Sequence, residues 1–140
     1  MATIKRFEDL EIWKLSRELS KTVFIFVRRE EFSKDFKLIN QINSASGSVM
    51  DNIAEGFERG GNQEFVQFLY IAKSSCGEAR SQLYVALDQK YLEQNKVASL
   101  LIILKRLSVM IKHLIDHLKR SGLRGPKYGS SNQSRPSDAP

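Results

Sequence analysis

Two histidines lie four residues apart near the end of the chain, His113 and His117, with Asp116 between them. On a helix this spacing places both imidazoles on one side, an arrangement that can begin a metal site. These are the only histidines in the sequence, and Leu114 stands where the metalloprotease motif HExxH requires glutamate. We therefore predict no metal site and interpret the pair as two titratable rings on a basic surface.

Other kinds of catalytic chemistry have no recognisable pattern in this sequence. Gly56, Gly60 and Gly61 do not match the spacing of a nucleotide-binding phosphate loop, and no predicted strand precedes them. Cys76 is the only cysteine and falls on an apolar helical face, so we interpret it as a buried core thiol. The sequence predicts a protein that is not an enzyme and carries no cofactor.

Basic residues near the carboxyl end form the strongest candidate for a binding site. Lys105, Lys112 and Lys119 recur every seven residues, and Arg106 and Arg120 stand beside them. Seven residues make almost two helical turns, so we expect the row on one side of a helix, repeating at about 10.5 Å. Such a row can contact several phosphates of a nucleic acid with little sequence preference. A basic face that only keeps the protein solvated remains open as an alternative.

The net charge of +6 is unevenly distributed along the chain. Residues 95–140 hold nine Lys/Arg and two acidic residues, which gives this segment a net charge of +7. Residues 1–94 hold thirteen Lys/Arg and fourteen acidic residues, which gives a net charge of −1. This asymmetry favours a polyanionic partner. Arg124 and Lys127 could add a flexible contact, and Tyr128 beside them is a candidate for stacking on a base.

Four segments show the apolar spacing of a helix and are joined by short polar connections. Short connections force neighbouring helices to run antiparallel, so we predict an all-α, up-down-up-down four-helix bundle. The bundle is expected to occupy residues 1–121, and residues 122–140, rich in Gly, Ser and Pro, are expected to form a disordered tail. The predicted helices are residues 9–28, 35–59, 62–89 and 95–121.

Inner positions and caps can be assigned within these segments. The third helix has a seam at Phe65, Leu69, Ala72, Cys76, Ala79, Leu83 and Ala86. The fourth has one at Leu100, Leu104, Leu107, Ile111, Leu114 and Leu118. The predicted amino-terminal caps, in chain order, are Glu8 or Asp9, Ser33 or Asp35, Asn62, and Asn95.

The second and third helices are expected to pair closely about the turn at Gly60 and Gly61. Reflecting the sequence about this turn pairs positions that sum to 121, which places the small residues 45–48 opposite residues 73–76. Small residues facing small residues allow two helices to approach closely. The same reflection predicts two hydrogen-bonded pairs, Asn43 with Glu78 and Gln41 with Arg80.

Two runs, residues 23–27 and 100–104, are apolar without a break and therefore cover the whole circumference of a helix. A monomeric four-helix bundle cannot bury them completely, so we predict a homo-oligomer. The expected interface residues are Phe24, Ile25, Leu101, Ile102 and Ile103.

A longer pattern points to a known family. The stretch NIAEGFERGGNQEFVQFLYIAKSS, preceded by QINSASGSV and by FEDLEIWK, resembles the four-helix-bundle proteins encoded in intervening sequences of bacterial 23S rRNA genes. Accessory variability proteins of diversity-generating retroelements share this fold family. The resemblance covers roughly Phe7 to Leu118 and implies a small helical bundle, often a ring-shaped pentamer. It also implies nucleic-acid binding for some members and no established enzymatic activity.

The most specific part of this resemblance is the run from Asn52 to Gly56, with Gln41 as a further polar position. Asn52 and Glu55 could contact a ligand or satisfy the helix end and the turn, with Glu55 also reaching Arg59 one turn later. We favour the structural role, because acidic side chains repel phosphate.

The resulting hypothesis is an oligomeric protein that binds structured RNA or DNA, as an accessory factor to a reverse transcriptase or an rRNA element. The alternative is a protein-interaction scaffold with no role in nucleic-acid binding. The sequence has no apolar export signal and no run of 18 apolar residues, so we expect a cytoplasmic protein that does not enter a membrane.

Overall fold

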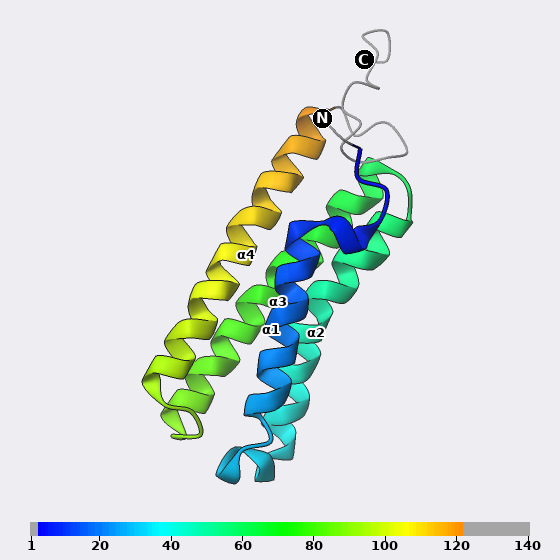
Figure 1. Cartoon of the computed structure of the whole chain (residues 1–140). Helices are drawn as coiled ribbons and strands as arrows, with labels where there is room; N and C mark the ends of the chain where they lie inside the picture. Colours follow the sequence, from blue (N-terminus) through cyan, green and yellow to red (C-terminus); the bar gives the residue numbers. More distant parts are fainter. Residues whose placement is uncertain (1–2, 122–140) are drawn as a thin grey trace, which may run out of the picture.

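The computed structural model describes residues 3–121, which fold into four long helices and two short 3₁₀ turns (Figure 1). The helices are α1 (Glu11–Phe26), α2 (Phe36–Glu58), α3 (Asn62–Asp88) and α4 (Gln94–Arg120). The 3₁₀ turns η1 (Phe7–Asp9) and η2 (Glu30–Lys34) precede α1 and α2. Within the described residues no strand is present, so the predicted all-α bundle is confirmed.

Each helix runs antiparallel to the next, and α1 closes the bundle against α4. The α2–α3 and α3–α4 pairs have the most extensive contacts, whereas α1 lies more loosely on α4. The seam predicted for α3 is buried at all seven positions. In α4 the prediction is wrong at one position: Ile115 is buried and Leu114 only half-buried. The helical period of 3.6 residues, slightly longer than a heptad spacing, shifts the inner face as the helix proceeds.

Most predicted caps are displaced by one or two residues. Asp35 does cap α2, because its Oδ1 accepts a hydrogen bond from the Leu38 N–H at 3.1 Å. Before α3 the capping residue is Gly61, with φ −112°, because Gly60 has already turned the chain at φ +89°, and Asn62 begins the helix as a buried residue. A φ this far positive suits glycine and strains other residues. The extended residues that precede α1 and α4 are Leu10 and Glu93 instead of Glu8, Asp9 or Asn95.

The charged connection between α1 and α2 packs against the rest of the bundle. Phe32 within η2 is 1% exposed, and its ring stacks on that of Tyr91 with centroids 5.1 Å apart. The Tyr91 hydroxyl donates to Asp35 Oδ2 at 2.9 Å, which raises the pKa of Tyr91. One aromatic pair therefore ties the α1–α2 connection to the α3–α4 connection.

Small residues meet between α2 and α3 as predicted, but in a different register. The Ser75 hydroxyl donates to Ser48 Oγ at 2.9 Å, so contacting positions sum to 123 instead of 121. Side chains on a helix lean toward its amino terminus, and each therefore covers a spot about one residue before its own Cα. In an antiparallel pair this lean adds one residue on each helix, which accounts for the shift of two.

The two hydrogen-bonded pairs predicted from the original register do not form. Glu78 lies near Gln82 on its own helix, with Nε2 of Gln82 donating at 3.5 Å, and Gln41 is exposed. None of the helices in residues 3–121 is long and apolar enough to cross a membrane.

Candidate nucleic-acid interface

All five predicted basic residues of α4 are exposed. Helical geometry alone produces this result, because the apolar seam of α4 faces α1, α2 and α3 and leaves the opposite side to solvent. Arg124, Lys127 and Tyr128 lie outside the described residues. The predicted row therefore exists as a surface feature over residues 105–120.

Arg106 and Lys112 of α4 line two separate grooves, although the sequence placed them on a similar side of the helix. Lys112 lines a shallow groove of about 230 Å³ between α4 and α3, together with Lys73, Ser108, Val109 and His113. Arg106 lines a separate cleft between α4 and α1, together with Glu11, Lys14, Leu15, Glu18 and Met110. Neighbouring residues are about 100° apart around a helix, and that angle is enough to direct the stripes into two grooves.

Contacts within the bundle hold two of the lysines. Lys119 Nζ donates to the Tyr70 hydroxyl at 2.9 Å, and this hydrogen bond raises the pKa of Lys119. Lys112 Nζ donates to both carboxylate oxygens of Asp116, at 2.8 and 2.9 Å, and thereby lowers the pKa of Asp116. Lys119 is therefore held against α3, whereas Lys112 is held along α4 itself.

Helix α3 contributes cations that the sequence analysis overlooked. Lys73 and Arg80 are seven residues apart, and Lys73 lies in the same groove as Lys112. Because α3 and α4 are antiparallel, one heptad further along α3 lies opposite one heptad back along α4, and this geometry predicts that Arg80 lies near Lys105. The matching seven-residue spacings on the two helices are a signal that the sequence contained.

Exposed tyrosines flank these cations. Tyr70 and Tyr84 are 43% and 49% exposed and lie on the same face of α3 as Gly77, at intervals of seven residues. We define the α3–α4 groove as the hollow lined by Lys73, Ser108, Val109, Lys112 and His113, together with the cations and tyrosines that flank it along the two helices: Tyr70, Arg80, Tyr84, Lys105 and Lys119.

The two histidines lie at or near the surface of α4, whereas Cys76 lies in the core of the bundle. His113 lines the α3–α4 groove, and His117 is half-buried. In the part of the chain that the structure describes, no three His, Cys, Asp or Glu side chains form a cluster suited to a metal ion. Cys76 is completely buried, and burial raises the pKa of its thiol to about 12, although Arg80 and Lys73 act to lower it. The interpretation of Cys76 as a core thiol is confirmed.

The polar motif of α2 is engaged inside the helical hairpin. Asn52 Nδ2 donates to the backbone oxygen and to Oγ of Ser48, both at 2.8 Å, so its partners lie one turn earlier and not at the helix end. Glu55 accepts from Arg59 at 3.4 Å, as expected for an i,i+4 pair. Gly56 is buried, and a Cβ built there would lie 2.6 Å from Phe68 Cβ. These contacts fit a structural role for the motif.

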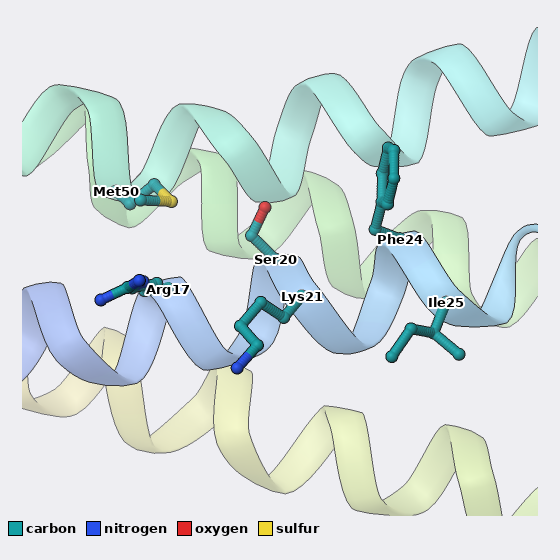
Figure 2. Close-up of a pocket in the computed structure, with 6 residues that line it drawn as sticks. All are labelled: Arg17, Ser20, Lys21, Phe24, Ile25 and Met50. Atoms are coloured by element: carbon teal, nitrogen blue, oxygen red, sulfur yellow. The ribbon is translucent and has the colours of Figure 1, made fainter.

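Apolar side chains are exposed on α1 and α4. Of the five predicted interface residues, Phe24, Ile25 and Ile102 are 48%, 59% and 67% exposed, whereas Leu101 and Ile103 pack against the core. Figure 2 shows Phe24 and Ile25 in a groove of about 440 Å³ on the α1 surface. The other lining residues are Arg17, Ser20, Lys21 and Met50.

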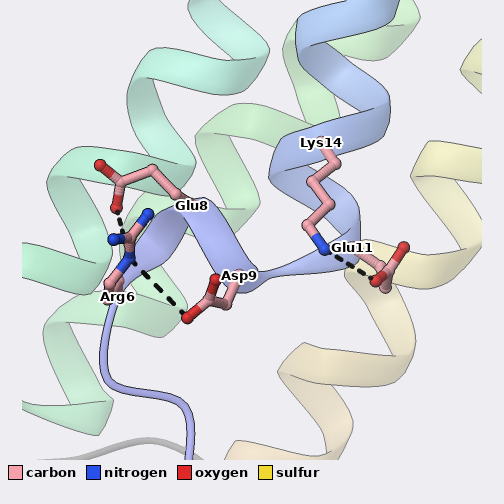
Figure 3. A network of polar contacts seen from close by, with 5 residues as sticks. All are labelled: Arg6, Glu8, Asp9, Glu11 and Lys14. Carbon is pink, nitrogen blue, oxygen red and sulfur yellow. Dashed lines mark hydrogen bonds and ion pairs between the residues drawn. The ribbon is translucent and has the colours of Figure 1, made fainter.

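Around the amino-terminal end of α1, Arg6 and Lys14 lie beside acidic side chains (Figure 3). Arg6 Nε lies 3.7 Å from Glu8 Oε1 and 3.8 Å from Asp9 Oδ2. Lys14 Nζ lies 3.4 Å from Glu11 Oε2. This balance leaves the α4 side as the region of excess positive charge.

The sequence model of the family described as 23S rRNA-intervening sequence protein matches residues 8–113. The chain belongs to this family. A similar solved structure is that of a protein of unknown function from the S23 ribosomal protein family of Bacteroides thetaiotaomicron. It has 19% sequence identity and a TM-score of 0.69, over 75% of this chain and 95% of that chain, and it supports the fold alone. No curated protein matches the chain.

Proposed function

We propose that this member of the 23S rRNA-intervening sequence protein family binds RNA or DNA through the basic surface of α4. The observation that carries this proposal is the row of exposed cations between Lys105 and Arg120, on the helix that contributes most of the net positive charge. The family description, which refers to 23S rRNA, supports an RNA partner.

Binding would come mainly from the release of counterions when lysine and arginine side chains neutralise phosphates. The lysines repeat at about 10.5 Å along the helix, so one molecule spans several phosphates without reading bases. The affinity should therefore fall steeply with salt and depend little on sequence. This is a binding role, not a catalytic one.

Assembly would multiply the basic surface. Phe24, Ile25 and Ile102 are exposed apolar residues that a second copy could cover, and we propose a homo-oligomer on this basis. A pentameric ring, a partnership with a reverse transcriptase and a cytoplasmic location come from the family resemblance and the sequence, and they belong to the same proposal.

The test replaces the five cations Lys105, Arg106, Lys112, Lys119 and Arg120 by Gln and measures affinity for a structured RNA and a duplex DNA over a salt series. We expect weaker binding and a shallower salt slope with unchanged helicity and particle size, because these residues lie off the core seam. The matched control replaces five exposed lysines elsewhere: Lys5, Lys14, Lys21, Lys34 and Lys37. It removes the same charge and should retain more of the affinity.

The alternative is a protein-interaction scaffold, which the apolar groove at Phe24, Ile25 and Met50 favours. Parent protein that binds neither nucleic acid at low salt would overturn the nucleic-acid proposal in favour of the scaffold. Equal loss in the α4 variant and the control variant would instead assign binding to total charge and not to α4.

A further inference from the structure

The α3–α4 groove combines three features that the outer face of α4 lacks: cations from two helices, exposed tyrosine rings and, on α3 near Lys73, a glycine with open space around it. We propose that this groove holds a single-stranded segment of nucleic acid, with phosphates between the cations of both helices and bases stacked on Tyr70 and Tyr84. This inference rests on the proposed function and names the residues and the nucleic-acid form that it leaves unspecified.

The cations face each other across the groove. Lys73 and Lys112 line the same groove from opposite helices. Arg80 and Lys105 lie one heptad, about 10.5 Å, from them along their own helices, so antiparallel helix geometry predicts that these two cations also face each other. A phosphate between two such side chains is neutralised from both sides, which no residue pair on a single helix face achieves. The carboxylate beside them, Asp116, is bonded to Lys112, so the charges of this pair offset each other and the excess positive charge comes from the other cations.

No side chain covers α3 at Gly77, one turn after Lys73. A Cβ built on Gly77 would meet nothing within 4 Å, and Gly77 is exposed although it lies in the middle of a 27-residue helix. Glycine at this position weakens the helix by about 0.5–1 kcal/mol relative to alanine. Close approach of a ligand to the backbone of α3 is a role that this glycine can fill.

The tyrosines favour a single strand. Tyr70 and Tyr84 are fourteen residues apart on one face of α3, which corresponds to about 21 Å along the helix. Lys119 fixes Tyr70 by a hydrogen bond, with Nζ 5.2 Å from the ring centre. Bases that are unpaired can stack on such rings, whereas bases in a duplex already stack on each other.

The cleft that Arg106 lines, between α4 and α1, is less favourable for a phosphate than the α3–α4 groove. Arg106 lines its cleft with Glu11 and Glu18 of α1, and acidic side chains repel phosphate. Lys21 and Lys37, which are exposed on α1 and α2, provide a control that removes the same charge as Lys73 and Arg80 from outside both the groove and the basic surface of α4.

The experiment compares two double variants, Lys73→Gln with Arg80→Gln and Lys21→Gln with Lys37→Gln. The probes are a labelled 20-nucleotide single-stranded RNA of mixed sequence and the same RNA as a duplex, at fixed low salt. We expect the groove variant to lose about ten-fold or more in single-strand affinity and the Lys21/Lys37 control variant less than about three-fold. Lys73→Arg with Arg80→Lys keeps the charge and should bind like the parent.

A second pair of variants tests the stacking. Tyr70→Ala and Tyr84→Ala should each weaken single-strand binding by about ten-fold and leave duplex binding nearly unchanged. Tyr70→Phe keeps the ring but loses the bond to Lys119, so it should retain most of the affinity. Circular dichroism and particle size are measured for every variant.

The outcomes separate this inference from the proposed function. Parent protein that binds neither RNA form overturns both. The groove proposal is overturned, and the basic surface of α4 keeps its role, if the parent protein binds RNA and the two double variants lose affinity equally. The same conclusion follows if neither tyrosine substitution changes the affinity.

Discussion

The two sides of α3 use polar and small residues in opposite ways. Toward α2, Ser75 bonds to Ser48, and Gly56 permits contact with Phe68, so polar groups and glycine serve the packing. Toward α4, Lys73 lines an open groove, and Gly77 has no neighbour for a side chain to meet. The difference shows that residue type alone does not separate a structural position from a binding position; the partner across the interface does.

Three consecutive residues make the comparison testable within one helical turn. Ser75 faces α2, Cys76 is buried in the core, and Gly77 is exposed on the face that carries Lys73. Substitutions at or near these positions should affect stability in different directions.

The largest expected effect concerns the reactivity of Cys76. Its pKa of about 12, against an ordinary value of 9.0, leaves about a thousand-fold less thiolate at pH 8, because burial disfavours the charged form. A chromogenic disulfide reagent should react very slowly with the native protein and rapidly in denaturant. Fast reaction in native buffer would show that the core around α3 opens readily.

The same shift gives stability a pH dependence. Because the folded pKa is raised, the native state keeps the proton while the unfolded state loses it, so this contribution to stability is lost as pH rises from 9 toward 12. Between pH 8 and pH 10.5, the free energy of unfolding measured in urea should decrease more for the parent protein than for Cys76→Ala.

The next effect is expected at the close approach of α2 and α3. Gly56→Ala would place Cβ 2.6 Å from Phe68 Cβ, an atom fixed directly to the backbone, and should lower the free energy of unfolding by about 1–3 kcal/mol. Thermal or urea unfolding measures it. A neutral result would mean that the helices separate at little cost.

A smaller effect is expected for the serine pair. Ser75 is 7% exposed, and Ser75→Ala removes its hydrogen bond to Ser48. This substitution should lower the free energy of unfolding by about 0.5–1.5 kcal/mol. Ser74→Ala is the matched control, because the exposed Ser74 bonds only to the backbone of Ile71 and should change stability little. Equal effects would remove the distinction between the two serines.

The smallest effect has the opposite sign. Gly77→Ala meets no atom within 4 Å and should raise the free energy of unfolding by about 0.5–1 kcal/mol, since alanine suits a helix better. The same unfolding measurements check it. A loss of stability would show that the α3–α4 groove is narrower than the structure indicates.

The sequence allowed the fold to be predicted almost completely, because periodicity determines which face of a helix is buried. Leu69, Ala72 and Cys76 are all in the core as expected. Register was less accessible: the pairing of Ser48 with Ser75 depends on the lean of side chains along two helices, which a symmetric reflection ignores. Capping residues shifted for a similar reason, since the actual backbone path at Gly60 and Gly61 decides where a helix begins.

The candidate site was predictable only in part. The exposed row on α4 follows from its own heptad spacing, but its division between two grooves depends on which helix lies on each side. Lys73 and Arg80 were overlooked because a single sequence does not show which cations of α3 face α4 and which face solvent. Tyr70 and Tyr84 were likewise visible as residues but not as neighbours of the lysine row.

The turn at Gly60 also has a consequence for the order of folding. Only residues 59–61 separate α2 from α3, so bringing these helices together closes a very short loop and loses little chain entropy. Contact between α1 and α4 instead joins distant parts of the chain and becomes favourable only later. We expect core substitutions in α2 and α3 to slow refolding and those in α1 mainly to speed unfolding, which stopped-flow kinetics measures. The central hairpin would then be the nucleus on which the two outer helices assemble.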